Sequence, residues 1–151
     1  LVPTEGIRRE LQVHGYGNLE VVSRGVDTKL FSPAHRDTSL RASWGVDDTT
    51  QVALYVGRLA PEKNLQLVFA AFAAMHQHNP HTRLVLVGDG PDRAALQAVH
   101  PQAVFCGMRS GADLTLHYAP AHVFLFPSLT DSFVNVTIVA MAIGLANDTY
   151  D

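Results

Sequence analysis

Short apolar runs, each followed by a glycine or a proline, constrain the fold of this chain more than any other feature of its sequence. Four of them contain almost no polar residue: 52–56, 84–87, 104–106 and 123–126. Runs of this length and composition are typical of strands that are buried on both faces of a parallel sheet. A further candidate strand, 19–23, is followed by turn and breaker residues such as Gly25 and Pro33.

Helical patterns separate these runs. The clearest covers 61–78, where apolar residues recur every three or four positions and Pro61 stands at the start. Weaker patterns cover 38–44, with Asp37 as the expected N-cap, 91–99, 112–119, with Ser110 and Asp113 at capping-box spacing, and 134–143. This regular alternation predicts an α/β fold, a Rossmann-like parallel sheet with helices on both faces. In such sheets ligands bind beyond the carboxyl ends of the strands, so we expect the functional residues in the loops that follow the four apolar runs.

Composition excludes several classes of protein. The 151 residues suit one compact domain, and 47% apolar against 17% charged residues argues against intrinsic disorder. The longest apolar stretches, 67–75 and 138–146, are too short to span a membrane. The single cysteine, Cys106, allows no internal disulfide, and a net charge of −3 provides no field that would attract nucleic acid.

The loop after the first apolar run carries two cations. Arg58 and Lys63 bracket the predicted start of the helix over 61–78. A helix N-terminus has free N–H groups and a partial positive charge, so two added cations would make an anion site suited to phosphate. Two solvated surface cations explain the same spacing equally well.

The next two loops give weaker signals. Gly88 and Gly90 resemble part of a dinucleotide-binding turn, but the third glycine is absent, which disfavours a nicotinamide enzyme. We expect both glycines only to supply positive φ angles before a helix that begins at Pro91. After the third run, Gly107, Met108 and Arg109 expose backbone groups to a flat ligand, or Gly107 is an ordinary turn residue.

The last loop contains one carboxylate, Asp131, which either binds sugar hydroxyls or caps the following helix together with Ser128. The clustered histidines, His76, His78 and His81, suggest a metal site at first sight. We instead expect them at the C-terminal end of the long helix, where imidazoles favour the helix dipole, and no Cys, Asp or Glu completes a ligand set. No metal site is predicted.

Five motifs in order resemble one family. They are the segments 24–33, 56–64 (VGRLAPEKN), 84–91 (LVLVGDGP), 104–107 (VFCG) and 126–133 (FPSLTDSF). Together they are similar to the retaining glycosyltransferases called family 4 or group 1, and most of all to bacterial mannosyltransferase-like members. The resemblance implies the two-domain GT-B architecture, in which the C-terminal Rossmann-like domain binds a nucleotide sugar. It assigns 1–22 to the tail of an N-terminal acceptor domain and linker, and 23–151 to the nucleotide-sugar-binding domain, truncated at its C-terminus.

The same resemblance implies roles for individual residues. Arg58 and Lys63 would neutralise the donor diphosphate and stabilise the leaving nucleoside diphosphate without a metal or other cofactor, and Asp131 would hold the donor sugar. The remaining binding positions would be Gly57 beside Arg58, Gly107 and Met108 at the base, and Ser132, Phe133, Val134, Asn135, Val136 and Val139 at the sugar, phosphate and ribose.

The chain also departs from the family pattern. Asp131 and Val139 stand where the family has glutamates, Val134 stands where it has glycine, and the residues after Gly144 replace a usual apolar strand. Two hypotheses follow. The first is the donor-binding part of a retaining enzyme that moves a hexose, such as mannose from GDP-mannose, to a glycan or lipid hydroxyl. That enzyme would be cytoplasmic, with peripheral contact to the cytoplasmic face of a membrane left open. The alternative is a degenerate, noncatalytic binding module of the same fold.

Overall fold

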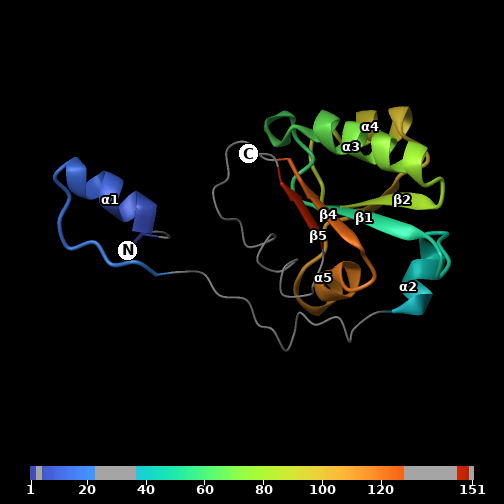
Figure 1. The fold of residues 1–151 in the computed structure, drawn as a ribbon, viewed down its shortest axis with the longest axis horizontal. Coiled ribbons are helices and arrows are strands. Elements are labelled where there is room, and N and C mark those ends of the chain that lie inside the picture. Colours follow the sequence, from blue (N-terminus) through green and yellow to red (C-terminus); the bar gives the residue numbers. More distant parts are fainter. Residues whose placement is uncertain (3–4, 23–36, 128–145, 150–151) are drawn as a thin grey trace.

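The computed structural model describes residues 1–2, 5–22, 37–127 and 146–149. Within them, parallel strands form a five-stranded sheet of order β3-β2-β1-β4-β5; the strands other than β3 are labelled in Figure 1. The strands are β1 (Gln51–Val56), β2 (Thr82–Val87), β3 (Val104–Gly107), β4 (Val123–Phe126) and β5 (Ala146–Thr149). The four apolar runs are therefore strands, as predicted. After Gly144, where the sequence departs from the apolar strand usual in the family, the polar segment 146–149 still forms a strand, β5, which pairs with β4 along its whole length.

The register of the central strands brings their carboxyl ends level. Val56 pairs with Val87, and Val87 pairs with Gly107. A register shift between Leu86 and Val87 advances β3 by one residue, so that Gly107 rather than Cys106 lies beside the end of β2. The first residues of three loops thus meet at one edge of the sheet, which we call the carboxyl edge.

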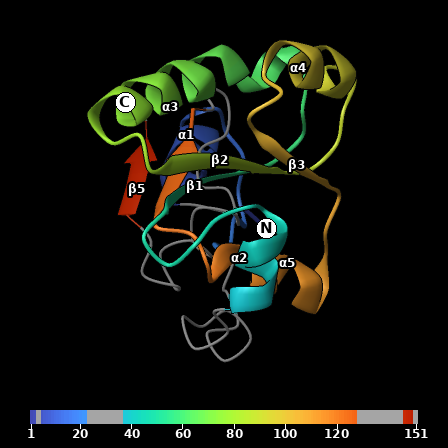
Figure 2. The same ribbon diagram turned by 90° about the vertical axis from the view of Figure 1, so that its right-hand side faces the viewer.

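Helices cover both faces of the sheet, as predicted. Figures 1 and 2 show α3 (Leu65–His78) and α4 (Arg93–Val99) over one face, and α2 (Thr38–Ser43) and α5 (Gly111–Tyr118) over the other. Because successive strand residues point to opposite faces, Val52 and Leu54 pack in one core cluster with Trp44, while Ala53 and Tyr55 pack in the other. Both clusters are almost wholly apolar, and together they hold the sheet between two helical layers.

Several helix ends differ from the predictions. The cap of α2 is confirmed, since Asp37 Oδ1 accepts the N–H groups of Ser39 (2.8 Å) and Leu40 (3.3 Å). The long helix begins at Leu65, because Asn64 adopts a left-handed φ of 48° and leaves a separate 3-10 turn, η2 (Pro61–Lys63), before it. No capping box forms at α5, where the Ser110 side chain makes no cap hydrogen bond. Helix α4 begins at Arg93 rather than Pro91.

The N-terminal residues form a helix, α1 (Glu5–Val13), that the sequence patterns did not predict. The expected strand over 19–23 is wrong for residues 19–22, where only Val21 pairs, in a single bridge with Val2. The expected helix over 134–143 lies outside the described residues, and the boundary between 1–22 and 23–151 stays a prediction. None of the described helices is both long and apolar enough to cross a membrane.

Candidate functional site

A hollow of about 380 Å³ lies at the carboxyl edge, where the loops after β1, β2 and β3 meet. It is lined by Val56, Gly57, Arg58, Val87, Gly88, Asp89, Met108, Arg109 and Leu114. Its position agrees with the rule that ligands bind beyond the carboxyl ends of parallel strands. We call it the carboxyl-edge hollow.

The loops after β1 and β2 interlock at this hollow. Gly57 donates to the Val87 carbonyl (3.0 Å), and Leu59 donates to the Asp89 carbonyl (2.9 Å). A Cβ on Gly88, whose φ is +139°, would lie 1.9 Å from the Gly57 oxygen. A Cβ on Gly90 would lie 2.2 Å from the Leu59 oxygen. The φ angle of Gly90 is not positive, so the expected reason for a glycine there is wrong. A glycine is needed at this position because the two backbones approach each other too closely for a Cβ.

Arg58 is the predicted phosphate-binding residue that the structure brings to the hollow. Its side chain is 64% exposed, and its Nη1 lies 3.5 Å from Glu62 Oε1. An exposed ion pair of this length is worth little, so the guanidinium is available to an anionic ligand. The backbone of its loop is anchored to β1, because the Tyr55 hydroxyl donates to the Arg58 carbonyl at 3.0 Å.

Lys63, the other predicted cation, ends η2 and is half-buried. It does not line the carboxyl-edge hollow. The two cations therefore bracket the 3-10 turn rather than the first turn of α3, which changes the helix-dipole argument made from the sequence. The charged side chains that line the hollow are Arg58, Arg109, which is paired with Asp113, and Asp89, which is paired with Arg93.

Asp89 is a lining residue that the sequence reasoning missed. Its Oδ1 accepts the Gly90 N–H at 2.8 Å, and its Oδ2 accepts from Arg93 Nη1 at 2.9 Å. The Gly90 N–H, followed by Arg93, lowers the pKa of this carboxyl below its ordinary value. The useful signal was its position directly after Gly88, at the end of a buried strand.

The third loop contributes Met108 and Arg109, with Gly107 at its base. Gly107 is buried with φ +74°, and its carbonyl accepts the Gly88 N–H at 2.8 Å. Met108 is 70% exposed, while Arg109 donates to the Cys106 carbonyl (3.1 Å) and to Asp113 Oδ2 (3.2 Å). The loop therefore presents the apolar Met108 side chain, which suits contact with a flat heterocycle, while the Cys106 and Gly107 carbonyls are already hydrogen-bonded within the protein.

The remaining predicted site residues lie outside the described part of the chain. They are Asp131, Ser132, Phe133, Val134, Asn135, Val136 and Val139. Among the described residues, no three His, Cys, Asp or Glu side chains gather closely enough to hold a metal ion. The metal-free prediction remains a prediction. Burial raises the pKa of the Cys106 thiol, which argues against a nucleophilic role for it.

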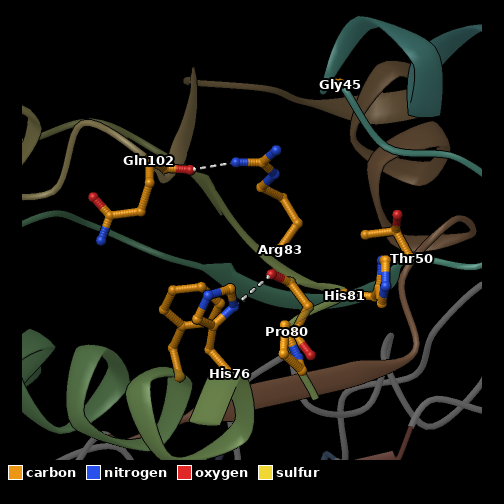
Figure 3. Close-up of a pocket in the computed structure, with 9 residues that line it drawn as sticks. Gly45, Thr50, His76, Pro80, His81, Arg83 and Gln102 are labelled. Carbon is orange, nitrogen blue, oxygen red and sulfur yellow. Dashed lines mark hydrogen bonds between the residues drawn. The ribbon is translucent and has the colours of Figure 1, made fainter.

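A second hollow, of about 300 Å³, lies at the opposite, amino edge of the sheet (Figure 3). Its lining includes His76, His81 and Arg83. His76 Nδ1 lies 3.3 Å from the Thr82 carbonyl, and Arg83 Nη1 donates to the Gln102 carbonyl at 3.0 Å. His76 and His78 stand in the last turn of α3, as predicted, whereas His81 lies beyond the helix, directly before β2. We call this cavity the amino-edge hollow.

Comparisons with known proteins agree with the fold. The sequence model of the family described as Glycosyl transferases group 1 matches residues 50–147. The chain is 39% identical over 145 residues to the GDP-mannose-dependent alpha-mannosyltransferase of Mycolicibacterium smegmatis, covering 96% of this chain and 37% of that protein. It therefore spans little more than a third of the length of this curated relative.

Two solved structures share the fold. One is HepE of Anabaena in complex with UDP and glucose, with a TM-score of 0.76 and 22% identity over 98% of this chain and 43% of HepE. The other is the C-terminal domain of the glycosyl transferase group 1 family protein LpcC from Francisella tularensis. Its TM-score is 0.68 at 19% identity, and the match covers 83% of this chain and 70% of that domain.

Proposed function

The chain belongs to the group 1 glycosyl transferases, and from this premise we propose that it is the donor-binding part of an enzyme that uses a nucleotide sugar. The observation that carries the proposal is the carboxyl-edge hollow, where Arg58 presents an exposed guanidinium between interlocked loops. Guanidinium groups bind phosphate oxygens through charge-assisted hydrogen bonds, and a nucleoside diphosphate supplies such oxygens beside a flat base.

The transferred sugar is proposed to be a hexose, with mannose from GDP-mannose as the first candidate, because the relative named above is a GDP-mannose-dependent mannosyltransferase. In this reaction the bond between the anomeric carbon and the phosphate oxygen breaks. The nucleoside diphosphate leaves with the electron pair of that bond. A glycan or lipid hydroxyl forms the new glycosidic bond, with retention of configuration, and its proton passes to the departing diphosphate. Arg58 and Lys63 are proposed to neutralise the charge that develops on the departing diphosphate, in place of a metal ion.

The residues over 131–136 are proposed to hold the donor sugar, with Asp131 in the role that glutamate has in the family. The acceptor is proposed to bind outside the residues of this chain, and the reaction to occur at the cytoplasmic face of a membrane. Because proximity of donor and acceptor supplies much of such catalysis, we expect purified residues 1–151 to bind donor without forming a glycoside.

The experiment is a calorimetric titration of the chain with GDP, UDP and ADP, each compared with its nucleoside. The proposal expects at least one diphosphate to bind much more tightly than its nucleoside. Equal affinities within every pair would contradict a diphosphate site. The identity of the tightest base then decides which nucleotide sugar is offered in a transfer assay.

A second function is favoured by two sequence positions. Val139 carries no hydrogen-bonding group where the family has glutamate, and Val134 replaces a glycine. These changes support a noncatalytic module that keeps the fold and loses transfer. A polypeptide that joins this chain to the remaining length of a relative separates the two functions, because only an enzyme would turn over a nucleotide sugar in the presence of acceptor.

A further inference from the structure

We propose that Tyr55 is a positioning residue, which holds the loop of Gly57 and Arg58 so that the Arg58 guanidinium meets the donor diphosphate; the inference rests on the proposed function. Tyr55 lies in β1, and its side chain is 2% exposed. Its hydroxyl donates a hydrogen bond to the Arg58 carbonyl at 3.0 Å. A buried residue of the strand is thereby bonded to the backbone of the residue that faces the ligand.

The space beside Gly57 shows how close the Tyr55 hydroxyl lies to the loop. A Cβ on Gly57 would lie 2.7 Å from the Tyr55 hydroxyl oxygen and 3.1 Å from Cζ of the ring. From another side, Gly88 packs against the Gly57 carbonyl so closely that it has no space for a Cβ. The loop is therefore held between the Tyr55 hydroxyl and the turn that follows β2.

The Arg58 side chain gives the loop little support of its own. It is 64% exposed, and its ion pair with Glu62 is long, at 3.5 Å. Because side-chain contacts do not fix the guanidinium, the backbone beneath it must set the position from which it reaches a ligand. A preorganised backbone lowers the entropic cost of binding. We expect this to strengthen binding of the phosphates rather than binding of the nucleoside.

Removal of the hydroxyl alone isolates this role. The Tyr55 ring packs in the core cluster that contains Leu59 and Phe69, and Tyr55→Phe keeps those apolar contacts. Tyr118→Phe is the matched control, since Tyr118 is also fully buried but lies in the other core cluster, on α5. Both variants lose one hydroxyl from the interior, and only one of them acts on the loop of Arg58.

The test is a calorimetric titration of GDP and of guanosine into the wild-type chain and both variants, with melting temperatures measured on the same samples. We expect Tyr55→Phe to weaken GDP binding roughly fivefold, the change that loss of one typical hydrogen bond produces. Guanosine binding should change by less than about twofold, within the scatter expected of distant sites. Tyr118→Phe should leave the ratio of GDP to guanosine affinity unchanged whatever its effect on melting temperature.

Each other outcome overturns a specific claim. If the wild type prefers GDP to guanosine and Tyr55→Phe keeps that preference in full, Tyr55 does not position Arg58, and the proposed function stands. If Tyr55→Phe weakens GDP and guanosine equally, its role is only structural, and the inference is again wrong. If the wild type shows no preference for GDP over guanosine, the proposed diphosphate site fails for this nucleotide, and the inference fails with it.

Discussion

The two edges of the sheet carry hollows of similar size and very different construction. At the carboxyl edge, the loops after β1 and β2 are joined by backbone hydrogen bonds and by glycines that allow near contact, and Arg58 extends from them into solvent. At the amino edge, His76 and Arg83 point their polar groups at backbone carbonyls (Figure 3). Adjacent strand residues face opposite sides of a sheet. The Thr82 and Arg83 side chains therefore line the amino-edge hollow from opposite faces of β2.

This difference explains why a hollow lined with basic side chains is not by itself an anion site. Arg83 already donates to the Gln102 carbonyl, so fewer of its N–H groups remain for a ligand. A cation on a loop that its neighbours hold rigidly is placed in advance of binding. The contrast between the two edges can be tested by making equivalent changes at both.

The largest expected effect is on stability, when one glycine at each edge is replaced by alanine. Gly88→Ala places a Cβ 1.9 Å from the Gly57 oxygen, so the interlocked loops must separate. We expect it to lower the free energy of unfolding by roughly 3 kcal/mol or more. Gly45 at the amino edge has φ +68° and open space around its Cβ position, so Gly45→Ala should cost only about 1 to 2 kcal/mol. Denaturant unfolding measures both values, and equal losses would refute the interlock.

The next effect concerns an arginine of each edge. Arg58→Ala should weaken binding of a nucleoside diphosphate by roughly 1.5 to 3 kcal/mol, the value of hydrogen bonds to charged groups, with little effect on the nucleoside. Arg83→Ala, the control at the amino edge, should leave both affinities as they are. Calorimetry on the two variants decides the point. A loss of diphosphate affinity in Arg83→Ala as large as that in Arg58→Ala would reverse the roles of the two edges.

A smaller effect tests the contact between Gly57 and Tyr55. Gly57→Ala creates a 2.7 Å contact with the Tyr55 hydroxyl, and in a Tyr55→Phe background the nearest remaining atom is Cζ at 3.1 Å. We therefore expect Gly57→Ala to be less destabilising in that background, by about 1 kcal/mol, as is usual for residues in direct contact. The unfolding free energies of the two single variants and the double variant measure this coupling. Strict additivity would mean that the hydroxyl does not lie beneath the loop.

The smallest effect is a pH dependence at the amino edge. Asp47 accepts hydrogen bonds from the hydroxyl and N–H groups of Thr49 and Thr50, which lower the pKa of its carboxyl from 3.8 to about 2. A depressed folded-state pKa contributes stability above the unfolded value, and this contribution disappears as the pH falls from 3.8 towards 2. The melting temperature of Asp47→Asn should therefore be lower than wild type at neutral pH and approach it below pH 3 or so. A melting-temperature difference that stays constant across this range would contradict the depressed pKa, because the contribution of the Asp47 carboxylate would then not depend on its protonation.

Much of the fold could be predicted from the sequence, because the apolar runs are long enough to identify strands and the helical periods between them are clear. The helix α1 and the wrong strand over 19–22 are failures to interpret a local pattern. The other failures depended on single backbone angles or on neighbouring strands. No pattern marked the left-handed Asn64 that separates η2 from α3. The polar strand β5 forms by pairing with β4, and the register shift in β3 that brings Gly107 level with Val87 is visible only in three dimensions.

The site could be predicted in part. The rule about strand ends placed Gly57, Arg58 and Met108 at the hollow, and the structure agrees. The rule also pointed to the loop after Val87, but Asp89 in that loop was given no role because the turn lacks the third glycine of a dinucleotide-binding motif. Tyr55 gave only a weak signal, a hydroxyl in an otherwise aliphatic strand, since its partner is a backbone carbonyl that a sequence does not display.

The central claim is that the carboxyl edge binds the diphosphate of a nucleotide. The most direct measurement follows backbone amide chemical shifts while GDP, and separately guanosine, is added to the chain. Shifts that GDP causes beyond those of guanosine should fall on Gly57, Arg58 and Gly88 and leave Gly45 and Arg83 at the amino edge unchanged. GDP-specific shifts that are largest at Gly45 and Arg83, or no difference between the two ligands anywhere, would contradict the account.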